Sequence, residues 1–392
     1  MADPFDIVKA LDAVPLCRVA CALIAGLVWS CSSTLAAPLQ PLGSDLQTWI
    51  VRAVEDARQF PAFESNGIVF DEIFHATMTP EEADLAEAAI RDYPDHPRRM
   101  ELAVERRRIA SGGDVRRWTI WSLDERTWRI CQETPFLSGT PYIDHGARSG
   151  IAWQLTNRDL SIVDLSQAPS GRAYGDNTGS IRMHLGHLLH GGLHFRPRSV
   201  PPVGDIKTDG VRWTAVMSDV TQSGAPIVAA FDGYWDAVHR RGFVERRVIV
   251  ESPSSQEVGK STRYSDWTFV PEVNLWIACR VDHARPDGVV VESLVYRGVV
   301  ASTPGEIVRL TQPPDPLGAD PVRGPLALAT FSDYRSDAMQ VTRFQDGDST
   351  VTPIQASIAD ERSRYRRIGW SIAAALAALL VLVKIRRRTA AS

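Results

Sequence analysis

Lysine is almost missing from this chain of 392 residues: only four of its 43 basic residues are lysine, and the rest are arginine. The arginines do not gather into a basic face, because they alternate with aspartate and glutamate and the formal net charge is −4. Nucleic-acid-binding proteins need a sustained basic surface to neutralise phosphates. The composition therefore predicts no nucleic-acid partner, and the arginine bias is typical of a GC-rich genome.

Motifs for covalent catalysis and cofactor binding are also lacking. The chain has no Gly-x-Ser-x-Gly elbow and no Gly-x-Gly-x-x-Gly loop, which excludes the usual anchors of acyl transfer and dinucleotide binding. Residues 259–261 end like a phosphate-binding loop, but Ser254 stands where its leading glycine belongs. We therefore predict a protein that is not an enzyme and has no cofactor.

A run of histidines at 184–194 is the one feature that favours metal chemistry. On a helix, the spacing of these histidines places them within about 120° of arc, so three of them could bind one metal. The run contains no acidic residue, lacks the zincin spacing, and Gly191-Gly192 is expected to break the helix before His194. The weak metal candidates are His184, His187 and His190.

The favoured interpretation of the same run is an amphipathic helix that covers a sheet. Its leucines would face inward and its histidines would lie on the polar side. The inward-facing set is Leu185, Leu188 and Leu189.

The first apolar stretch, 19–28, is typical of an export signal. Arg18 precedes it and small residues follow, so we predict cleavage after Ala36 or Ala37 and assign residues 1–37 to a signal peptide. Lipidation of Cys31 is the alternative.

A second apolar stretch, 368–383, carries no charge and runs into a basic cluster. It spans about 24 Å as a helix, against a hydrocarbon core of roughly 30 Å, and Lys384 can extend that length by reaching outward. With an exported domain upstream, the basic end stays in the cytoplasm. We predict a transmembrane helix at 368–385, a cytoplasmic tail at 386–392 and a single pass through the inner membrane, with the large domain in the periplasm.

The region between these two stretches reads as a folded domain at 38–311. Ser44 can cap a helix from Asp45 to about Gln59. A second helix should begin after Thr79, with Pro80 at its first position and Glu82 closing a capping box, and end near Tyr93.

From Glu101 the apolar period changes to two, starting with Leu102, Val104 and Ile109, which predicts strands. Turns are expected at Asp232-Gly233 and Asp287-Gly288. The pattern indicates an antiparallel meander that forms one large sheet with a deep apolar face. Its predicted strands are 115–121, 127–131, 211–217, 226–231, 242–251, 262–269, 273–281 and 289–301.

The remaining features are a proline-rich segment and two cysteines. Residues 312–367 are predicted to form this segment and a polar stalk. Cys131 and Cys279 fall in the exported domain, and both a disulfide between them and two separate buried thiols are open.

The strand Arg263-Tyr-Ser-Asp-Trp267, the following 273–277 and the Gly288 hairpin make residues 45–305 resemble the LolA-like outer-membrane lipoprotein-sorting family. The resemblance implies an α+β fold with a large curved antiparallel sheet, built as an incomplete barrel with covering helices. It also implies an apolar hollow that binds lipid or acyl chains. Ala278 and Cys279 stand where the family has a proline, and the tether favours a fixed receiver or sensor over a soluble carrier.

The function expected from this resemblance is lipoprotein sorting or envelope sensing, with lipid or lipoprotein acyl chains as partners. Two alternatives stay open: an envelope protein–protein interaction module without a lipid cavity, and a His-dependent metalloenzyme. The ligand-binding candidates are the tryptophans on the predicted strands: Trp118, Trp213, Trp267 and Trp276.

Overall fold

The computed structural model describes residues 40–41 and 44–353, except for 58, 60, 64–65, 125, 136, 138, 140, 165–176, 194–202, 221–224, 336–339 and 346–347. Within these residues, no helix is long and apolar enough to cross a membrane. The predicted signal peptide, most of the stalk, the transmembrane helix and the tail lie outside them, so these assignments stay predictions.

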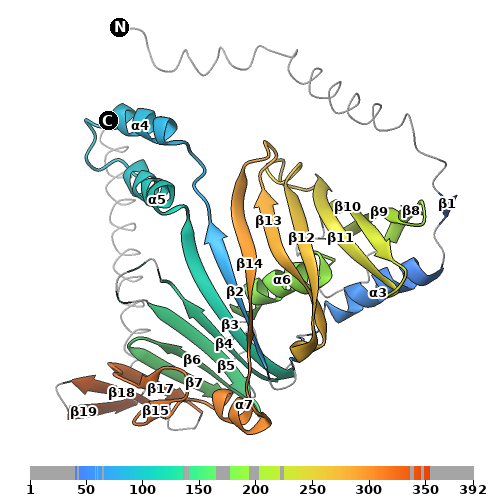
Figure 1. The fold of residues 1–392 in the computed structure, drawn as a ribbon. Helices are drawn as coiled ribbons and strands as arrows, with labels where there is room; N and C mark the ends of the chain where they lie inside the picture. Colours follow the sequence, from blue (N-terminus) through green and yellow to red (C-terminus); the bar gives the residue numbers. More distant parts are fainter. Residues whose placement is uncertain are drawn as a thin grey trace, which may run out of the picture.

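One open sheet of 17 strands dominates the structure (Figure 1). From edge to edge the strands follow the order β1-β8-β9-β10-β11-β12-β13-β14-β2-β3-β4-β5-β6-β7-β17-β18-β19. Neighbours are antiparallel except β7 and β17, which are parallel. The predicted α+β class with a large curved, unclosed sheet is confirmed.

The strands are short to medium in length, and two of them form a separate ribbon, β15 with β16. Their bounds are β1 Gln40–Pro41, β2 Gly67–Phe74, β3 Asp114–Asp124, β4 Thr127–Glu133, β5 Tyr142–Arg148, β6 Ile151–Thr156, β7 Asp159–Asp164, β8 Val203–Thr208, β9 Arg212–Val220, β10 Pro226–Asp236, β11 Arg241–Glu251, β12 Ser261–Val270, β13 Leu275–Ala284, β14 Val290–Val300, β15 Ala319–Asp320, β16 Gly324–Pro325, β17 Thr330–Tyr334, β18 Gln340–Gln345 and β19 Asp348–Pro353.

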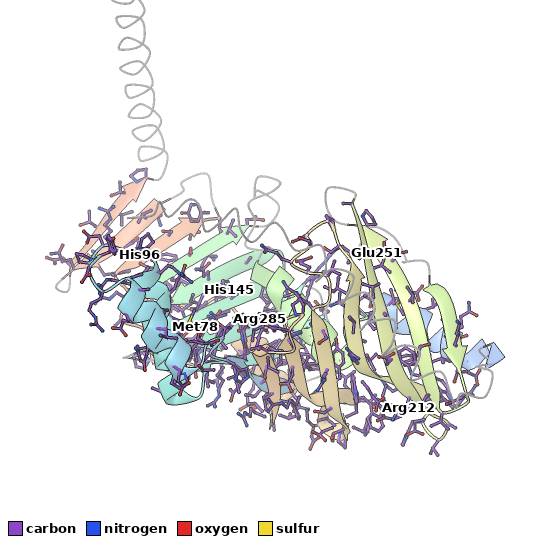
Figure 2. All side chains as sticks on the ribbon, turned by 90° about the horizontal axis from the view of Figure 1, so that it is seen from above. Met78, His96, His145, Arg212, Glu251 and Arg285 are labelled. Atoms are coloured by element: carbon purple, nitrogen blue, oxygen red, sulfur yellow. The ribbon has the colours of Figure 1, made fainter. Side chains whose placement is uncertain are left out.

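Two of the helices pack against the sheet and two project from it as a hairpin. Helix α6 lies against β13 and β14, and α3 lies against β11. The α4–α5 hairpin, which Met78 precedes and whose connection holds His96, stands apart from the wing that carries Arg212 and Glu251 (Figure 2). The bounds are α3 Ser44–Asp56, α4 Pro80–Ala89, α5 Arg98–Ser111, α6 Asn177–His190 and α7 Pro304–Leu310, with a 3-10 turn at Pro271–Val273.

The two predicted helix starts are confirmed. Helix α3 begins at Ser44. Helix α4 has Thr79 as its N-cap, where the Thr79 hydroxyl accepts from the Glu82 amide and the Glu82 carboxylate accepts from the Thr79 amide. This reciprocal capping box satisfies two amides that the helix cannot pair itself.

The strand predicted from Leu102, Val104 and Ile109 is wrong, because these residues lie in α5. The segment is rich in arginine, glutamate, alanine and leucine, which all favour helix, and three apolar residues are too few to fix a period of two. The helix ends at Gly112, which has φ +76°, and β3 follows at once. Local propensity outweighed the apolar spacing.

One predicted turn is confirmed and the other is wrong. Gly288 lies in a turn with φ +86°, between β13 and β14. Asp232-Gly233 lies inside β10 instead, at a register shift against β11. A Cβ at Gly233 would lie 2.1 Å from the Phe243 carbonyl oxygen and 2.6 Å from the Trp213 ring. Glycine therefore serves close packing there, not chain reversal.

The sheet continues beyond residue 311, where the sequence predicted the domain boundary. Strand β17 pairs in parallel with β7, and β18 and β19 extend the sheet from it. The proline-rich segment holds the β15–β16 ribbon, and within it Asp320 is buried. The structure thus places β17, β18 and β19 in the large sheet, and Asp320 of the ribbon contacts Arg129 of β4.

Candidate functional site beneath helix α6

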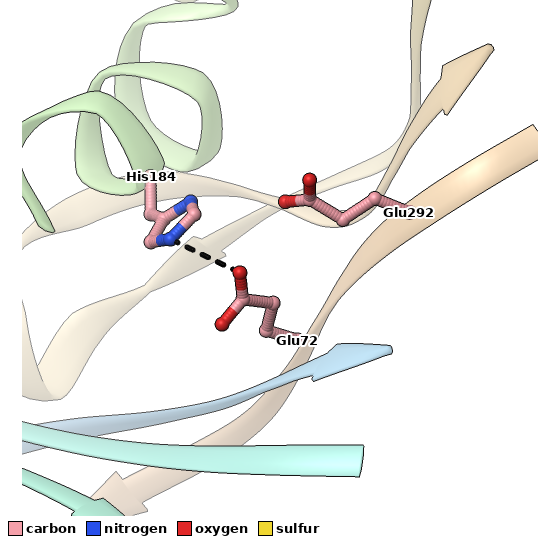
Figure 3. A group of neighbouring side chains, drawn as sticks. All are labelled: Glu72, His184 and Glu292. Carbon is pink, nitrogen blue, oxygen red and sulfur yellow. Dashed lines mark ion pairs between the residues drawn. The ribbon is translucent and has the colours of Figure 1, made fainter. Parts of the chain in front are cut away.

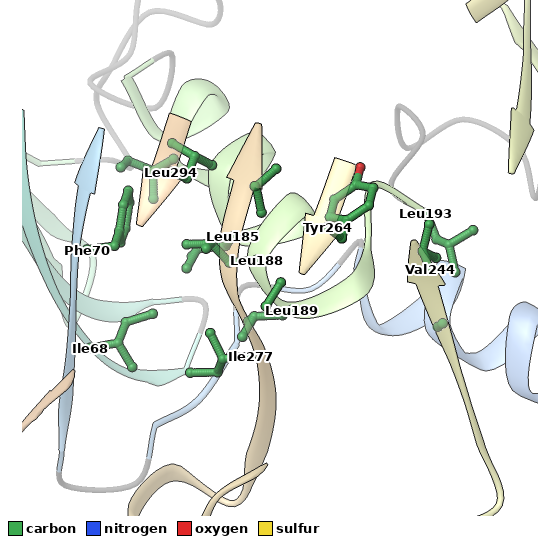
Figure 4. Packing of buried hydrophobic residues seen from close by; sticks show 14 of the residues in the cluster. Ile68, Phe70, Leu185, Leu188, Leu189, Leu193, Val244, Tyr264, Ile277 and Leu294 are labelled. Atoms are coloured by element: carbon green, nitrogen blue, oxygen red, sulfur yellow. The ribbon is translucent and has the colours of Figure 1, made fainter. Parts of the chain in front are cut away.

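Helix α6 covers the concave face of the sheet with an apolar surface (Figure 4). The predicted inward orientation of Leu185, Leu188 and Leu189 is confirmed, since all three are buried. The strands beneath present a matching surface, because register places paired residues on one face. This surface includes Ile68, Phe70, Ile277, Val281 and Leu294.

Beneath α6, its buried leucines pack against apolar side chains of the sheet. A small pocket at the end of α6, bordered by Pro61, Arg182 and His190, has a volume of about 10 Å³. Such a volume holds about one water molecule. In the described part of the chain, α6 therefore occupies the place where the sequence predicted an apolar hollow.

The four candidate tryptophans do not converge on one point. Trp118 lies beneath the middle of α6, with its ring 6.0 Å from that of His184. Trp267 lies past the C-terminal end of α6 and donates to the Val244 carbonyl. Trp213 packs against Trp49 near α3, and Trp276 packs among other aromatic rings beside Phe243. Trp118 and Trp267 thus border α6.

The histidines of α6 are not on an exposed polar side, which corrects that prediction. His184 and His187 are buried. The His187 Nδ1 lies 2.8 Å from the Tyr264 hydroxyl, and its ring packs edge-on against His283. They are buried because the strands beneath α6 supply polar partners at these positions.

The three metal candidates of α6 have different surroundings. His184 faces Glu72, and His187 faces Tyr264. His190 borders the small pocket, where burial and then the Arg241 charge lower its pKa to about 3. His194 lies outside the described residues. These histidines therefore do not form one metal site with each other.

A row of polar side chains crosses the concave face beneath α6. The register places Arg247, Thr262, His283 and Glu292 side by side on β11, β12, β13 and β14. Thr262 and His283 are linked, with Oγ1 and Nδ1 3.0 Å apart. This polar row is the part of the otherwise apolar face that can bind a polar group.

Glu72 of β2 lies on the same face, opposite Leu294 in the neighbouring row, and faces His184 of α6 (Figure 3). The Glu72 Oε2 accepts hydrogen bonds from Arg116 Nη1 and Trp118 Nε1, both at 3.0 Å. Its Oε1 faces His184 Nε2 at 3.5 Å. Glu292 approaches from β14, and its side chain makes no hydrogen bond with a described residue. One carboxylate is therefore held in place and the other is not.

Burial controls the protonation of this group. Burial, followed by the neighbouring Glu72 charge, raises the pKa of Glu292 to about 7, although Arg116 opposes the shift. Burial also raises the pKa of Glu72. Burial lowers the pKa of both His184 and His283 to about 4, and nearby positive charge adds to each shift. Both imidazoles are thus neutral near pH 7.

Several buried nitrogens around α6 lack partners in the described part of the chain. They are the Nδ1 of His184 and the Nε of Arg116, Arg247 and Arg241. Buried polar atoms are nearly always hydrogen-bonded in proteins, so each exception asks for an explanation. Their concentration at α6 is the feature expected of a site that receives a polar ligand.

Sequence analysis missed Glu72 and Glu292, the two carboxylates of this group. Glu72 follows Asp71 in the otherwise apolar run 67–74, and Glu292 interrupts the apolar run 289–296. An acid within a buried strand is costly unless it is paired or binds a ligand, and this signal could have identified both residues.

On the other face of the sheet, His75, Ser293 and Asp282 have the composition of a catalytic triad. The Ser293 hydroxyl donates to Asp282 at 2.5 Å and lies 2.7 Å from His75 Nε2. In a triad the histidine lies between serine and acid, whereas here the serine does. Ser293 is also fully buried, so the group does not have the geometry of an activated nucleophile.

Cys131 and Cys279 are separate thiols in the structure. They lie on β4 and β13, with β3, β2 and β14 between them. Four strand spacings amount to about 19 Å, far beyond the reach of a disulfide.

No family model and no curated protein sequence matches this chain. Among solved structures, it is similar to a domain described as an outer membrane lipoprotein-sorting protein from Vibrio parahaemolyticus, at TM-score 0.34 and 7% identity, covering 66% of this chain and 95% of that one. It is also similar to a DUF1329 family protein from Desulfovibrio piger, at TM-score 0.31 and 7% identity, covering 66% and 92%. The predicted resemblance to lipoprotein-sorting proteins is confirmed as a structural similarity of this low degree.

Proposed function

We propose that this protein is anchored in the inner membrane and uses the concave face of its periplasmic sheet to bind a lipid or an acylated ligand. The observation that carries the proposal is the broad apolar face beneath α6, formed by Phe70, Val281 and Leu294 among others. Among the described residues, helix α6 and not a second sheet covers this part of the face. We propose that an acyl chain takes the place of α6.

Helix α6 and an acyl chain would stabilise the covered concave face by comparable free energies. Five apolar side chains of α6 and the following turn are buried: Ile181, Leu185, Leu188, Leu189 and Leu193. At roughly 1.5–3 kcal/mol each, their burial stabilises the covered state by about 7–15 kcal/mol. An acyl chain of about 15 methylenes gains about 12 kcal/mol at about 0.8 kcal/mol per methylene. The exchange is therefore close to balanced.

The chain after α6 is suited to such a change. Gly191 and Gly192 follow the helix directly, with φ of +61° and +74°. Glycine adopts this region without steric cost. In addition, the buried nitrogens without partners near α6 would gain partners from a polar headgroup. Both features support α6 as a displaceable cover.

A second candidate is an interaction module of the cell envelope, which binds a protein and no lipid. The filled space beneath α6 favours it. So does the α4–α5 hairpin, where Leu85, Tyr93 and Met100 are 72%, 64% and 77% exposed. Exposed apolar side chains on a projecting hairpin are suited to contacts with another protein.

The test is native mass spectrometry of the full chain, purified from its host envelope in mild detergent, with lipid extraction in parallel. Tyr296 is half-buried on the concave face beside Phe70, and Val295 lies on the opposite face. Tyr296→Glu should abolish copurification of a phospholipid or acyl species, while Val295→Glu should retain it. A wild-type chain without bound lipid would contradict the proposal and favour the interaction module.

A further inference from the structure

The strongest unexplained feature is the meeting of Glu72, His184 and Glu292 from three separate elements, β2, α6 and β14. One ligand atom from each lies within 4.8 Å of the other two. Each comes from a position that regular structure fixes, so the arrangement is a consequence of the fold. Figure 3 shows the three side chains pointing toward a common centre.

The distances suit a metal ion. Two ligands bound tetrahedrally at about 2.1 Å lie about 3.4 Å apart. The separation between His184 Nε2 and Glu72 Oε1 is 3.5 Å. Glu292, whose ligand atom lies within 4.8 Å of the other two, completes the set by moving inward. This movement breaks no hydrogen bond with a described residue, because the Glu292 side chain makes none.

The surroundings orient the ligands as outer groups do in metal sites. Arg116 and Trp118 hold the Oε2 of Glu72, which leaves Oε1 free to face the centre. The rings of Phe70 and Trp118 pack around the His184 imidazole. Such contacts fix ligand orientation and strengthen metal affinity.

The charges at the centre are incomplete without a cation. The Arg116 guanidinium pairs with Glu72. Among the described residues no cation forms an ion pair with Glu292, and the Arg116 charge that acts on it is already paired with Glu72. His184 is 5% exposed, and its Nε2 faces the Glu72 carboxylate. A buried imidazole and two carboxylates of this kind form an N,O,O donor set.

We propose that Glu72, His184 and Glu292 form a binding site for one divalent first-row metal ion of the zinc class. The mixed nitrogen and oxygen donors suit such ions better than calcium or magnesium, which prefer oxygen alone. Three protein ligands leave one position of a tetrahedral ion open to water or to a ligand oxygen. Because His184 lies on α6, this site forms only while α6 covers the sheet, and displacement of α6 by an acyl chain would separate His184 from the two carboxylates.

The experiment is isothermal titration of the full chain in detergent, without a polyhistidine tag and after treatment with chelator, using Zn²⁺. A parallel titration with Co²⁺ reports the coordination geometry through visible absorption. We expect one Zn²⁺ per chain and an intense tetrahedral Co²⁺ spectrum. We expect a Kd of about 1 μM or lower. Absence of binding at about 100 μM Zn²⁺ would overturn the proposal.

The variants are Glu292→Gln and His184→Gln, each expected to weaken Zn²⁺ binding by about 100-fold or more. Glu292→Gln keeps the side-chain size and breaks no hydrogen bond with a described residue, so it reports on the metal even if His184→Gln fails to fold. The control is His145→Gln, a histidine on β5 that is buried to the same degree, at 6% exposed. Zn²⁺ affinity of Glu292→Gln equal to that of wild type would overturn the proposal.

Discussion

Two buried clusters of charged residues lie on the same sheet and differ in how completely they are paired. In the first, Arg129 contacts Asp144 at 2.7 Å and Asp320 at 2.8 Å, and all three side chains are fully buried. Arg323 adds a second contact to Asp144 at 2.6 Å. This cluster, called the arginine cluster here, joins β4 and β5 to the β15–β16 ribbon.

The second cluster, Glu72, His184 and Glu292, is called the glutamate cluster. Here one carboxylate is held by Arg116 and Trp118, while Glu292 and the Nδ1 of His184 have no hydrogen bond in the described residues. A buried charge costs several kcal/mol unless it is paired. The comparison indicates that the arginine cluster stabilises the fold and that the glutamate cluster is suited to binding a ligand.

The largest expected effect is in the arginine cluster. Arg129→Met leaves Asp144 and Asp320 with less compensation, so we expect a loss of about 3–5 kcal/mol in the free energy of unfolding. Denaturant titration measures it. Arg335→Met, which removes an exposed partner of Asp333, is the control and should cost less than about 1 kcal/mol. Equal losses of unfolding free energy in the two variants would contradict the expected difference between buried and exposed ion pairs.

The next effect concerns the glutamate cluster with metal. Zn²⁺ at about 100 times its Kd should raise the free energy of unfolding of wild type by about 2.7 kcal/mol. Glu292→Gln should show almost none of this gain, whereas Arg129→Met should show all of it. Thermal unfolding with and without Zn²⁺ provides the measurement. A gain in Glu292→Gln as large as in wild type would mean that the ion binds elsewhere.

Without metal, the glutamate cluster should make stability depend on pH. Burial and Glu72 raise the pKa of Glu292 from 4.5 to about 7 in the folded chain, with Arg116 opposing and with His184 and His283 neutral beside it. The protonated form is favoured by folding, so its contribution is full below pH 4.5 and is lost as the pH rises through 7.

Glu292→Gln removes this loss. In chelator, we expect it to be more stable than wild type at pH 8, by on the order of 2 kcal/mol, and similar to wild type at pH 4.5. The difference between the two unfolding curves across pH is the measurement. Parallel pH profiles would show that Glu292 carries no burial penalty.

The smallest effect tests a region outside both clusters. Thr79→Ala removes the N-cap of α4 and should cost about 1 kcal/mol or less of stability. Amide hydrogen exchange should increase in the first turn of α4 only. A change in Zn²⁺ affinity in this variant would contradict the separation of the hairpin from the glutamate cluster.

Local chemistry explains which parts could be predicted from the sequence. The start of α4 depends on Thr79, Pro80 and Glu82, which lie within four positions of the chain, and the predicted strands 115–121, 226–231 and 242–251 follow from their own alternation. The turn at Gly288 likewise depends on a dipeptide. Interactions between residues a few positions apart can be recognised in the sequence.

The glutamate cluster could not be predicted in this way. Glu72 and Glu292 lie 220 positions apart and meet only because β2 pairs with β14. The burial of His184 and His187 depends on which strand residues lie beneath α6, which the helical period does not reveal. The Arg129 contact with Asp320, 191 positions apart, has the same origin.

The central claim is that the concave face beneath α6 is the binding surface. Hydrogen exchange of the full chain in detergent, with and without an excess of an acylated phospholipid, tests it most directly. The account predicts that amides of 181–193 lose protection when the lipid binds, while those of β13 and β14 keep theirs. Lipid binding that leaves the protection of α6 unchanged, or an absence of binding, would contradict it.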